Sequence, residues 1–255
     1  ETKAKYERFA KAYEFYFDKS TRFMRGLDSK GEWRTPFNPR ASTHRSDDYC
    51  EGTAWQWTWF VPHDVDGLVN LMGGEDAFVQ KLDSLFTVDS SLEGEMISSD
   101  ISGLIGQYAH GNEPSHHVIH LYNYVNRPWR TQELVDSVYQ SQYANITDGL
   151  SGNEDCGQMS AWYILNSMGF YQVCPGKPVY SIGRPAFDKA VINLPEDKTF
   201  SIIVKNNSKE NKYIESISLN GKSLDTPFFN HQDIANGGTM EISMTDKPNY
   251  KTHIP

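Results

Sequence analysis

Cysteine, basic charge and long apolar runs are all scarce in this 255-residue chain. Lys and Arg number 24 against 33 Asp and Glu, so the formal net charge is −9. A nucleic-acid partner is disfavoured, because phosphate contacts need clustered basic side chains. No apolar run approaches the roughly 18–20 residues of a membrane-spanning helix. The opening residues, ETKAKYERFAKAYEFYF, lack the basic-then-apolar order of a signal peptide.

The three cysteines, Cys50, Cys156 and Cys174, are too few and too scattered for a disulfide framework. We expect free thiols rather than a disulfide. Cys50 and Cys156 each stand beside an acidic residue of a motif described below. There we expect them to be buried, as small apolar packing groups.

The spacing of apolar residues changes near residue 176. Upstream, three- and four-residue spacing predicts helices over about residues 3–24, 63–86, 114–122, 132–143 and 159–168. Downstream, the runs FSIIVKN, YIESISLN and MEISM lie between turn signals and predict strands of a small antiparallel β unit. The sequence therefore predicts a mainly α chain, with an α-helical portion at residues 1–176 and a C-terminal β-rich subdomain at residues 177–255.

Acidic residues recur in three loops, YCEG, GNEP and GNEDCG, each of which precedes a predicted helix. They place Glu51, Glu113, Glu154 and Asp155 beside Gly or Asn and close to aromatic residues. Loops on a rigid frame commonly carry catalytic groups. The alternative is that Glu113 and Glu154 only stabilise a helix N-terminus. Three such loops in one chain favour a functional site.

The segment that follows Glu51 is rich in aromatic residues, with Trp55, Trp57 and Trp59 close behind it. Aromatic faces stack against the apolar face of a pyranose ring, and they also fill cores between helices. Trp55 and Trp59 share one helical face, whereas Trp57 points elsewhere. At least two of the three tryptophans are expected to be core residues.

Histidines and oxygen donors are mixed in the segment HGNEPSHHVIH. His116 and His120 lie one helical turn apart, a spacing found in zinc sites. No HExxH motif is present, however, and Asn112 with Glu113 supplies the oxygen ligands that hard cations prefer. The pattern favours calcium over zinc without proving it.

Two spaced carboxyl groups are what glycoside hydrolysis requires, one as a proton donor and one to activate water or attack carbon. Glu154 and Asp155 are adjacent acids, which repel each other or share a cation. The residues alone therefore make a glycosidase a candidate.

Four segments resemble the α-mannosidases of glycoside hydrolase family 92: YCEGTAWQWTWFVPHDV, GLIGQYAHGNEPSHHVIHLYNYV, PWRTQE and SGNEDCGQMSAWYILNSMGFYQVCPG. The resemblance as a whole extends over essentially residues 1 to 190, in order. The resemblance implies a calcium-dependent, exo-acting, inverting α-mannosidase that acts on mannose-containing oligosaccharides such as N-glycans. It also implies a bacterial periplasmic or cell-surface protein. The implied architecture is part of an (α/α)6 barrel followed by small β elements, without the family's N-terminal β-sandwich.

The resemblance also implies roles for individual residues. Glu51 corresponds to the general acid and Asp155 to the general base, with Glu154 as its helper or substitute. Asn112 and Glu113 correspond to the calcium-binding pair. Weaker candidates for sugar contacts are Trp55, Gln56, His116 and His117.

Because the family's site is shared between the sandwich and the barrel, we expect the isolated chain to be weakly active or inactive. Two alternatives stay open. One is a carbohydrate-binding fragment without activity of its own, and the other is an (α/α)6 glycosidase for a different sugar.

Overall fold

The structure is a computed structural model that describes residues 1–250. These residues form two compact units, each described here by itself. Unit 1 comprises Glu1–His116 with Ser151–Asn153, and unit 2 comprises His117–Leu150 with the chain from Glu154 onward. The predicted boundary near residue 176 stays a prediction. Among the described residues, no helix has both the length and the apolar character that crossing a bilayer requires.

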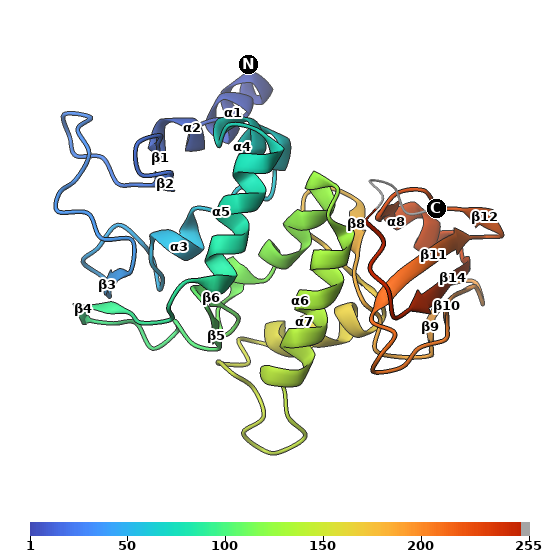
Figure 1. Cartoon of the computed structure of the whole chain (residues 1–255). Coiled ribbons are helices and arrows are strands. Elements are labelled where there is room, and N and C mark those ends of the chain that lie inside the picture. The colour runs from blue at the N-terminus through green and yellow to red at the C-terminus, as the bar shows by residue number, and fades with distance from the viewer. Residues whose placement is uncertain (251–255) are drawn as a thin grey trace. The chain divides into compact units, whose positions relative to one another are not determined.

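Unit 1 consists of short helices and two-stranded sheets (Figure 1, blue to green). Strand β1 pairs antiparallel with β2, β3 pairs parallel with β4, and β5 pairs antiparallel with β6. Its helices are α1 (Thr2–Ala10), α2 (Tyr13–Tyr16), α3 (Ala54–Trp57), α4 (Val65–Leu71), α5 (Glu75–Thr87) and the 3-10 helix η1 (Glu113–Ser115). Its strands are β1 (Phe17–Asp18), β2 (Phe23–Met24), β3 (Ala41–Thr43), β4 (Glu93–Met96), β5 (Leu104–Ile105) and β6 (Tyr108–Ala109).

Unit 2 combines helices with a five-stranded sheet, ordered β12-β11-β14-β10-β9, and a three-stranded sheet, ordered β13-β8-β7. Its helices are the 3-10 helix η2 (Val118–Val125), α6 (Pro128–Ser141), α7 (Gln158–Ser167) and α8 (His231–Ala235). Its strands are β7 (Phe170–Tyr171), β8 (Val179–Ile182), β9 (Lys189–Asn193), β10 (Thr199–Lys205), β11 (Tyr213–Leu219), β12 (Lys222–Ser223), β13 (Phe228–Asn230) and β14 (Gly238–Thr245).

The large sheet of unit 2 confirms the three strands predicted from the two-residue period. Strand β10 alternates buried Phe200, Ile202 and Val204 with more exposed neighbours, as one covered face requires. The pairing is not purely antiparallel, because β10 and β14 run parallel. Parallel neighbours need a long crossover, and the chain between these two strands supplies it with β11 to β13 and α8.

The predicted fold class, a mainly α chain that forms part of an (α/α)6 barrel before an antiparallel β unit, is wrong. Helices hold 31 % of the residues and strands 23 %, in several sheets, so the chain mixes α and β structure throughout. The helix expected over residues 3–24 shows the reason. It ends at Tyr16, and the Asp18 side chain then accepts hydrogen bonds from the Ser20 N–H and the Thr21 hydroxyl in the turn between β1 and β2.

The cysteines of the described chain are free, as predicted, but the prediction that they are buried beneath the site is wrong. Cys50 and Cys156 are exposed and Cys174 is partly buried. Cys50 stands in the tight turn before α3, and Cys156 has a positive φ of 56° in the turn before α7. Both turns direct these residues to the surface.

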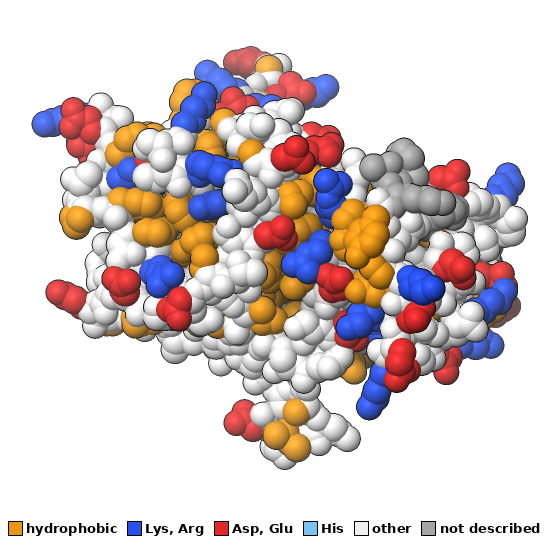
Figure 2. Space-filling view, in the orientation of Figure 1, with side chains coloured by type: hydrophobic (Ala, Val, Ile, Leu, Met, Phe, Trp, Pro, Cys, Tyr) orange, Lys and Arg blue, Asp and Glu red, His pale blue; other side chains and the backbone are white. Residues whose placement is uncertain are grey.

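Apolar side chains also reach the surface of unit 1. Figure 2 shows them gathered over the part of the chain that Figure 1 draws in blue and cyan. The exposed aromatic residues of unit 1 are Tyr6, Phe9, Phe15, Tyr16 and Phe60. Helix α1 has no buried residue at all. Within the predicted helix, Phe9 and Tyr16 are therefore exposed, whereas Phe17 is buried.

Candidate active site

The YCEG loop of unit 1 holds Glu51 in a left-handed backbone conformation, with φ of 50°. Few non-glycine residues adopt this region, and strained residues cluster at functional sites. The Glu51 side chain is half-buried, and its carboxylate forms no hydrogen bond or ion pair with the described residues. This carboxylate is free to act on a ligand.

The backbone around Glu51 is anchored from two sides. Asn112 donates a side-chain hydrogen bond to the Glu51 carbonyl at 2.9 Å, and Trp57 Nε1 donates to the Cys50 carbonyl at 2.7 Å. Gly52 allows this close approach, because a Cβ there would lie 2.7 Å from Trp57 Nε1. The GNEP and YCEG motifs, 61 residues apart, are thereby joined in one unit.

Helix α3 begins directly after this loop with a capping box. The Thr53 hydroxyl accepts from the Trp55 N–H, and Gln56 Oε1 accepts from the Thr53 N–H at 2.7 Å. Gln56 Nε2 then donates to the Gln107 carbonyl at 2.6 Å. Gln56 is buried, and both its amide oxygen and its amide nitrogen form hydrogen bonds. These bonds hold the loop that carries Glu51 in place.

Trp55 is also a core residue of unit 1. It is 8 % exposed, and its ring packs edge-on against Phe23, with 4.9 Å between centroids. Lys81 Nζ lies 3.2 Å from the Phe23 ring centroid and 4.3 Å from that of Trp55. Burial, with a smaller contribution from the positive charge of Arg22, lowers the pKa of Lys81 to about 7. No feature of the sequence marked this buried amine.

Trp57 and Phe60, in contrast, border a cavity of about 400 Å³ that reaches the Cys50 backbone. Their rings are 5.1 Å apart, and Tyr16 and Tyr49 line the same cavity. This is the aromatic surface nearest to Glu51 along the chain that a sugar ring could stack on. The helical spacing predicted that Trp57 faces away from Trp55, but only the structure shows that Trp57 lines a cavity.

The GNEP motif forms the start of η1. Asn112 Oδ1 accepts from the Glu113 N–H at 3.1 Å as the N-cap, and Pro114 occupies the first turn. His116 is buried and its Nε2 lies 2.9 Å from the His110 carbonyl. Burial is the main cause that lowers the pKa of His110 well below its usual value, and the charge of the neighbouring His116 is a smaller one. His110 is therefore neutral at pH 7.

These residues meet the requirements of a calcium site only in part. Within residues 1–250 no group of three His, Cys, Asp or Glu side chains is placed to hold a metal ion. Asn112 already uses its amide to cap η1 and to hold the Glu51 carbonyl. One carboxylate and one amide oxygen leave most of the six to eight oxygen ligands of Ca²⁺ to other donors.

Two histidines of unit 2 lie at or in η2, and one of them has a structural role. His117 is buried at the start of η2. His120 is fully buried, with Nδ1 3.1 Å from Ser181 Oγ and Nε2 2.9 Å from Asn166 Oδ1. Burial lowers the pKa of His120 to about 4, although the Asn166 hydrogen bond opposes the shift. Both of its ring nitrogens are occupied.

The two adjacent acids of the GNED loop, which both belong to unit 2, have different surroundings. The Glu154 carboxylate accepts from the Ser160 N–H at 3.0 Å and from the Ser160 hydroxyl at 2.8 Å, and so stabilises the first turn of α7. The Asp155 carboxylate makes no such contact within the described chain and is exposed. Asp155 has φ of 47° and begins three successive residues with positive φ, ending at Gly157.

Of the predicted site residues, unit 1 holds Glu51, Trp55, Gln56, Asn112, Glu113 and His116, and unit 2 holds His117, Glu154 and Asp155. Glu51 and Asp155 share a strained backbone and an unpaired carboxylate. The four candidate sugar contacts, Trp55, Gln56, His116 and His117, are all buried. Their contact with a sugar stays a prediction.

Comparison with known proteins identifies the family. The family model of the glycosyl hydrolase family 92 catalytic domain matches residues 1–246. The chain belongs to glycosyl hydrolase family 92. The resemblance inferred from the motifs is thereby confirmed.

Solved relatives share the family and the fold. A family 92 α-mannosidase from Bacteroides thetaiotaomicron, in complex with mannoimidazole, is 40 % identical with a TM-score of 0.88, over 95 % of this chain and 33 % of that one. A family 92 inverting mannosidase from the same species is 37 % identical with a TM-score of 0.80, over 93 % and 33 %. An uncharacterised secreted glycosidase from Arthroderma benhamiae is 34 % identical over 205 residues, 79 % of this chain and 24 % of that protein. This family 92 chain thus spans a third or less of the length of these relatives.

Proposed function

We propose that the protein is an exo-acting α-mannosidase that hydrolyses terminal α-linked mannose from mannosides or N-glycans with inversion. The observation that carries the proposal is the state of Glu51 and Asp155. In a family 92 chain, both acids stand in left-handed backbone on loops before helices, with carboxylates that no described residue engages. The α-mannosidase relatives at 37–40 % identity support the choice of sugar.

In this mechanism Glu51 acts as the general acid. Its carboxyl proton passes to the glycosidic oxygen as the bond from that oxygen to the anomeric carbon breaks. Asp155 acts as the general base and takes a proton from the water whose oxygen attacks the same carbon from the opposite face. Glu154 and Ser160 hold the Asp155 loop against α7, while Gln56 and Asn112 hold the Glu51 loop.

Calcium is proposed as the cofactor, with Glu113 and Asn112 among its ligands. When bound, the ion would hold sugar hydroxyls and stabilise negative charge near them. The oxygen chemistry of Glu113 supports this assignment, and the remaining ligands would come from water, sugar or residues outside this set.

A location outside the cytoplasm, in the periplasm or at a cell surface, is part of the proposal. The name of the fungal relative, a secreted glycosidase, supports export. Fractionation of the source cells, with detection by antibody, tests this point.

The function is tested by the release of free mannose and by a Glu51→Gln variant. We expect this variant to lose hydrolysis of disaccharides, whose leaving groups need protonation, far more than hydrolysis of activated aryl α-mannosides. Equal losses on both substrates would contradict the role of general acid. The rate of mannose release is measured for the 255-residue chain and for a longer active enzyme that contains it. We expect the chain alone to be weakly active or inactive.

A further inference from the structure

A groove runs along α6 and α7 of unit 2, away from the residues assigned above to catalysis. It consists of two cavities that share Tyr139 and Tyr163. The first, of about 400 Å³, is also lined by Tyr143, Asn145 and Ser160. The second, of about 450 Å³, is lined by a more polar set that includes Gln140, Arg184 and Lys209.

Tyrosine rings form the wall between the two cavities. The Tyr163 ring lies 5.5 Å from that of Tyr139 and 4.9 Å from that of Tyr143, centroid to centroid. The flanking rings are fixed, because Tyr139 donates to the Arg184 carbonyl at 3.0 Å and Tyr143 to the Met159 carbonyl at 2.9 Å. Tyr163 is half-exposed, and its hydroxyl has no partner among residues 1–250. The neighbouring rings therefore hold the Tyr163 ring in place, and its hydroxyl is available to a ligand.

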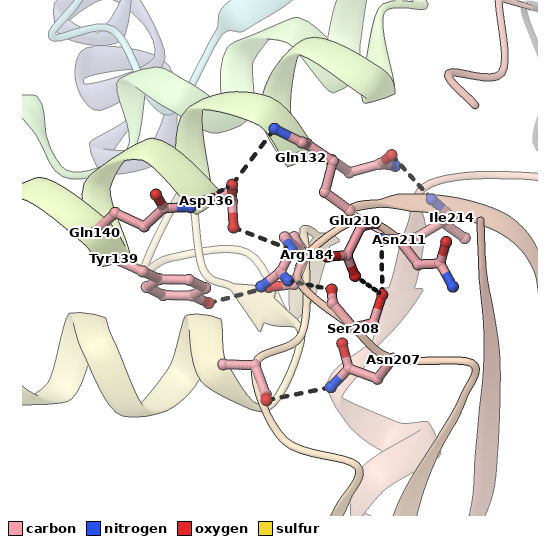
Figure 3. Close-up of polar contacts among 12 residues, drawn as sticks. Gln132, Asp136, Tyr139, Gln140, Arg184, Asn207, Ser208, Glu210, Asn211 and Ile214 are labelled. Carbon is pink, nitrogen blue, oxygen red and sulfur yellow. Dashed lines mark hydrogen bonds and ion pairs between the residues drawn. The ribbon is translucent and has the colours of Figure 1, made fainter. Parts of the chain in front are cut away.

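The polar wall of the second cavity is a network of ion pairs and hydrogen bonds around Asp136 (Figure 3). Arg184 Nε lies 3.2 Å from Asp136 Oδ1, Gln140 donates to Asp136 Oδ2 at 2.8 Å, and Arg184 donates to the Ser208 carbonyl at 3.0 Å. Lys212 Nζ adds a second cation 3.7 Å from Asp136. Arg184 and Lys212 both pair with the single Asp136 carboxylate, so this wall has one positive charge in excess but no group of unpaired cations that would bind a phosphate.

Unused hydrogen-bonding groups stand at both ends of the groove. Asn145 is exposed, and its amide forms no hydrogen bond in the described part of the chain. At the other end Lys209 is exposed and forms no ion pair with those residues. An aromatic wall with separate polar groups at each side suits a neutral ligand rich in hydroxyls, such as a saccharide.

Ser160 connects the groove to the GNED loop. It lines the first cavity, and its N–H and hydroxyl both hold Glu154, the neighbour of Asp155. From these observations we propose that the groove is an accessory saccharide site that binds sugar units of a mannose oligosaccharide away from the unit that is cleaved. The identity of the sugar rests on the proposed function, whereas the saccharide chemistry rests on the groove.

The test measures binding of α-linked mannotriose to the 255-residue chain by calorimetry and by saturation-transfer NMR. We expect Tyr163→Ala to weaken binding roughly fivefold, the loss of one stacked ring. Tyr163→Phe keeps the ring and should bind nearly as well as the parent chain. Phe15→Ala removes an aromatic side chain that is 73 % exposed in unit 1 and serves as the matched control.

Unchanged affinity of folded Tyr163→Ala, or no binding of mannotriose by the parent chain, would overturn the proposal. If Tyr163→Ala does not fold, the double variant Asn145→Ala with Lys209→Ala is used instead, because both side chains are exposed. This double variant should weaken mannotriose binding at least threefold. Unchanged affinity would again overturn the proposal. Displacement of mannotriose by inorganic phosphate would also contradict a saccharide site.

The same binding measurement, together with an assay of mannose release, on Asp155→Asn in an active enzyme that contains this chain separates this inference from the proposed function. Loss of hydrolysis with retained mannotriose binding at the groove supports both. Binding that depends on Tyr163, in a longer protein that contains this chain and never releases mannose, supports the groove and refutes the proposed hydrolysis. Hydrolysis without any dependence of binding on Tyr163 refutes the groove alone.

Discussion

The carboxylate of Glu154 accepts two hydrogen bonds from Ser160, from the backbone N–H at 3.0 Å and from the hydroxyl at 2.8 Å. Its neighbour Asp155 turns away from the helix in a left-handed conformation and binds none of the described residues. The two adjacent acids therefore have different roles. One stabilises the start of α7, and the other is available for chemistry.

We predict that the two acids respond differently to neutralisation in the active enzyme. Asp155→Asn should lower kcat by about 10²–10⁴-fold, the contribution of a general base, with little change in Tm. Glu154→Gln should lower Tm, because a charge at the N-terminus of α7 is lost, and should lower kcat less than about tenfold. Steady-state kinetics and thermal unfolding measure both. The reverse pattern would make Glu154 the base.

Gln56 is predicted to stabilise the Glu51 loop rather than to bind sugar directly. Gln56→Leu leaves the buried Thr53 N–H and the Gln107 carbonyl without their partner, at a cost of about 2 kcal/mol in the free energy of unfolding. Chemical denaturation measures this loss, and Gln80→Leu on the exposed face of α5 is the control. A raised KM with unchanged stability would instead make Gln56 a sugar contact.

Lys81 is predicted to make the stability of the chain depend on pH. Its pKa is about 7 in the folded state against 10.5 for an unperturbed lysine, so between these values the unfolded state binds more protons. Stability should therefore rise as the pH increases from about 7 to about 10.5. Lys81→Met should remove this rise and stabilise the chain at pH 7, whereas Lys30→Met on the surface should not. An unchanged pH profile in Lys81→Met would show that the amine is not desolvated.

Calcium dependence is predicted to centre on Glu113. Chelation should abolish mannose release, and added Ca²⁺ should restore it. Glu113→Gln should raise the Ca²⁺ concentration needed for half-maximal activity more than about tenfold, because a charged oxygen ligand is replaced by a neutral one. Glu95→Gln, at an exposed position of β4, is the matched control. Full activity in the presence of chelator would refute the cofactor.

Inversion predicts both a product and a geometry. The first mannose released should be the β-anomer, which NMR detects before mutarotation. In the active enzyme the carboxyl groups of Glu51 and Asp155 should lie about 6.5–9.5 Å apart, leaving room for the water. A crystal structure with a mannose analogue measures this separation. A separation near 5 Å with release of the α-anomer would indicate retention.

The strands could be predicted further than the helices. In a strand that buries one face, every second residue is apolar. The segment FSIIVKN follows this pattern and predicted β10 within one residue at each end. The helix expected over residues 3–24 failed beyond Tyr16, where a side-chain turn at Asp18 redirects the chain from β1 into β2. Local turn chemistry overrode the helical period there.

The sequence by itself determined the family and the three acidic loops, because long motifs and the order of their residues are carried by the chain alone. Only the tertiary structure decided how neighbouring residues divide their roles. Trp55 is covered by Lys81 while Trp57 faces a cavity, and Gln56 is committed to Gln107, 51 residues away. Glu154 is bound by α7 and Asp155 is not. Such differences arise from contacts that the order of residues does not display, and these contacts leave Asp155 rather than Glu154 with a free carboxylate.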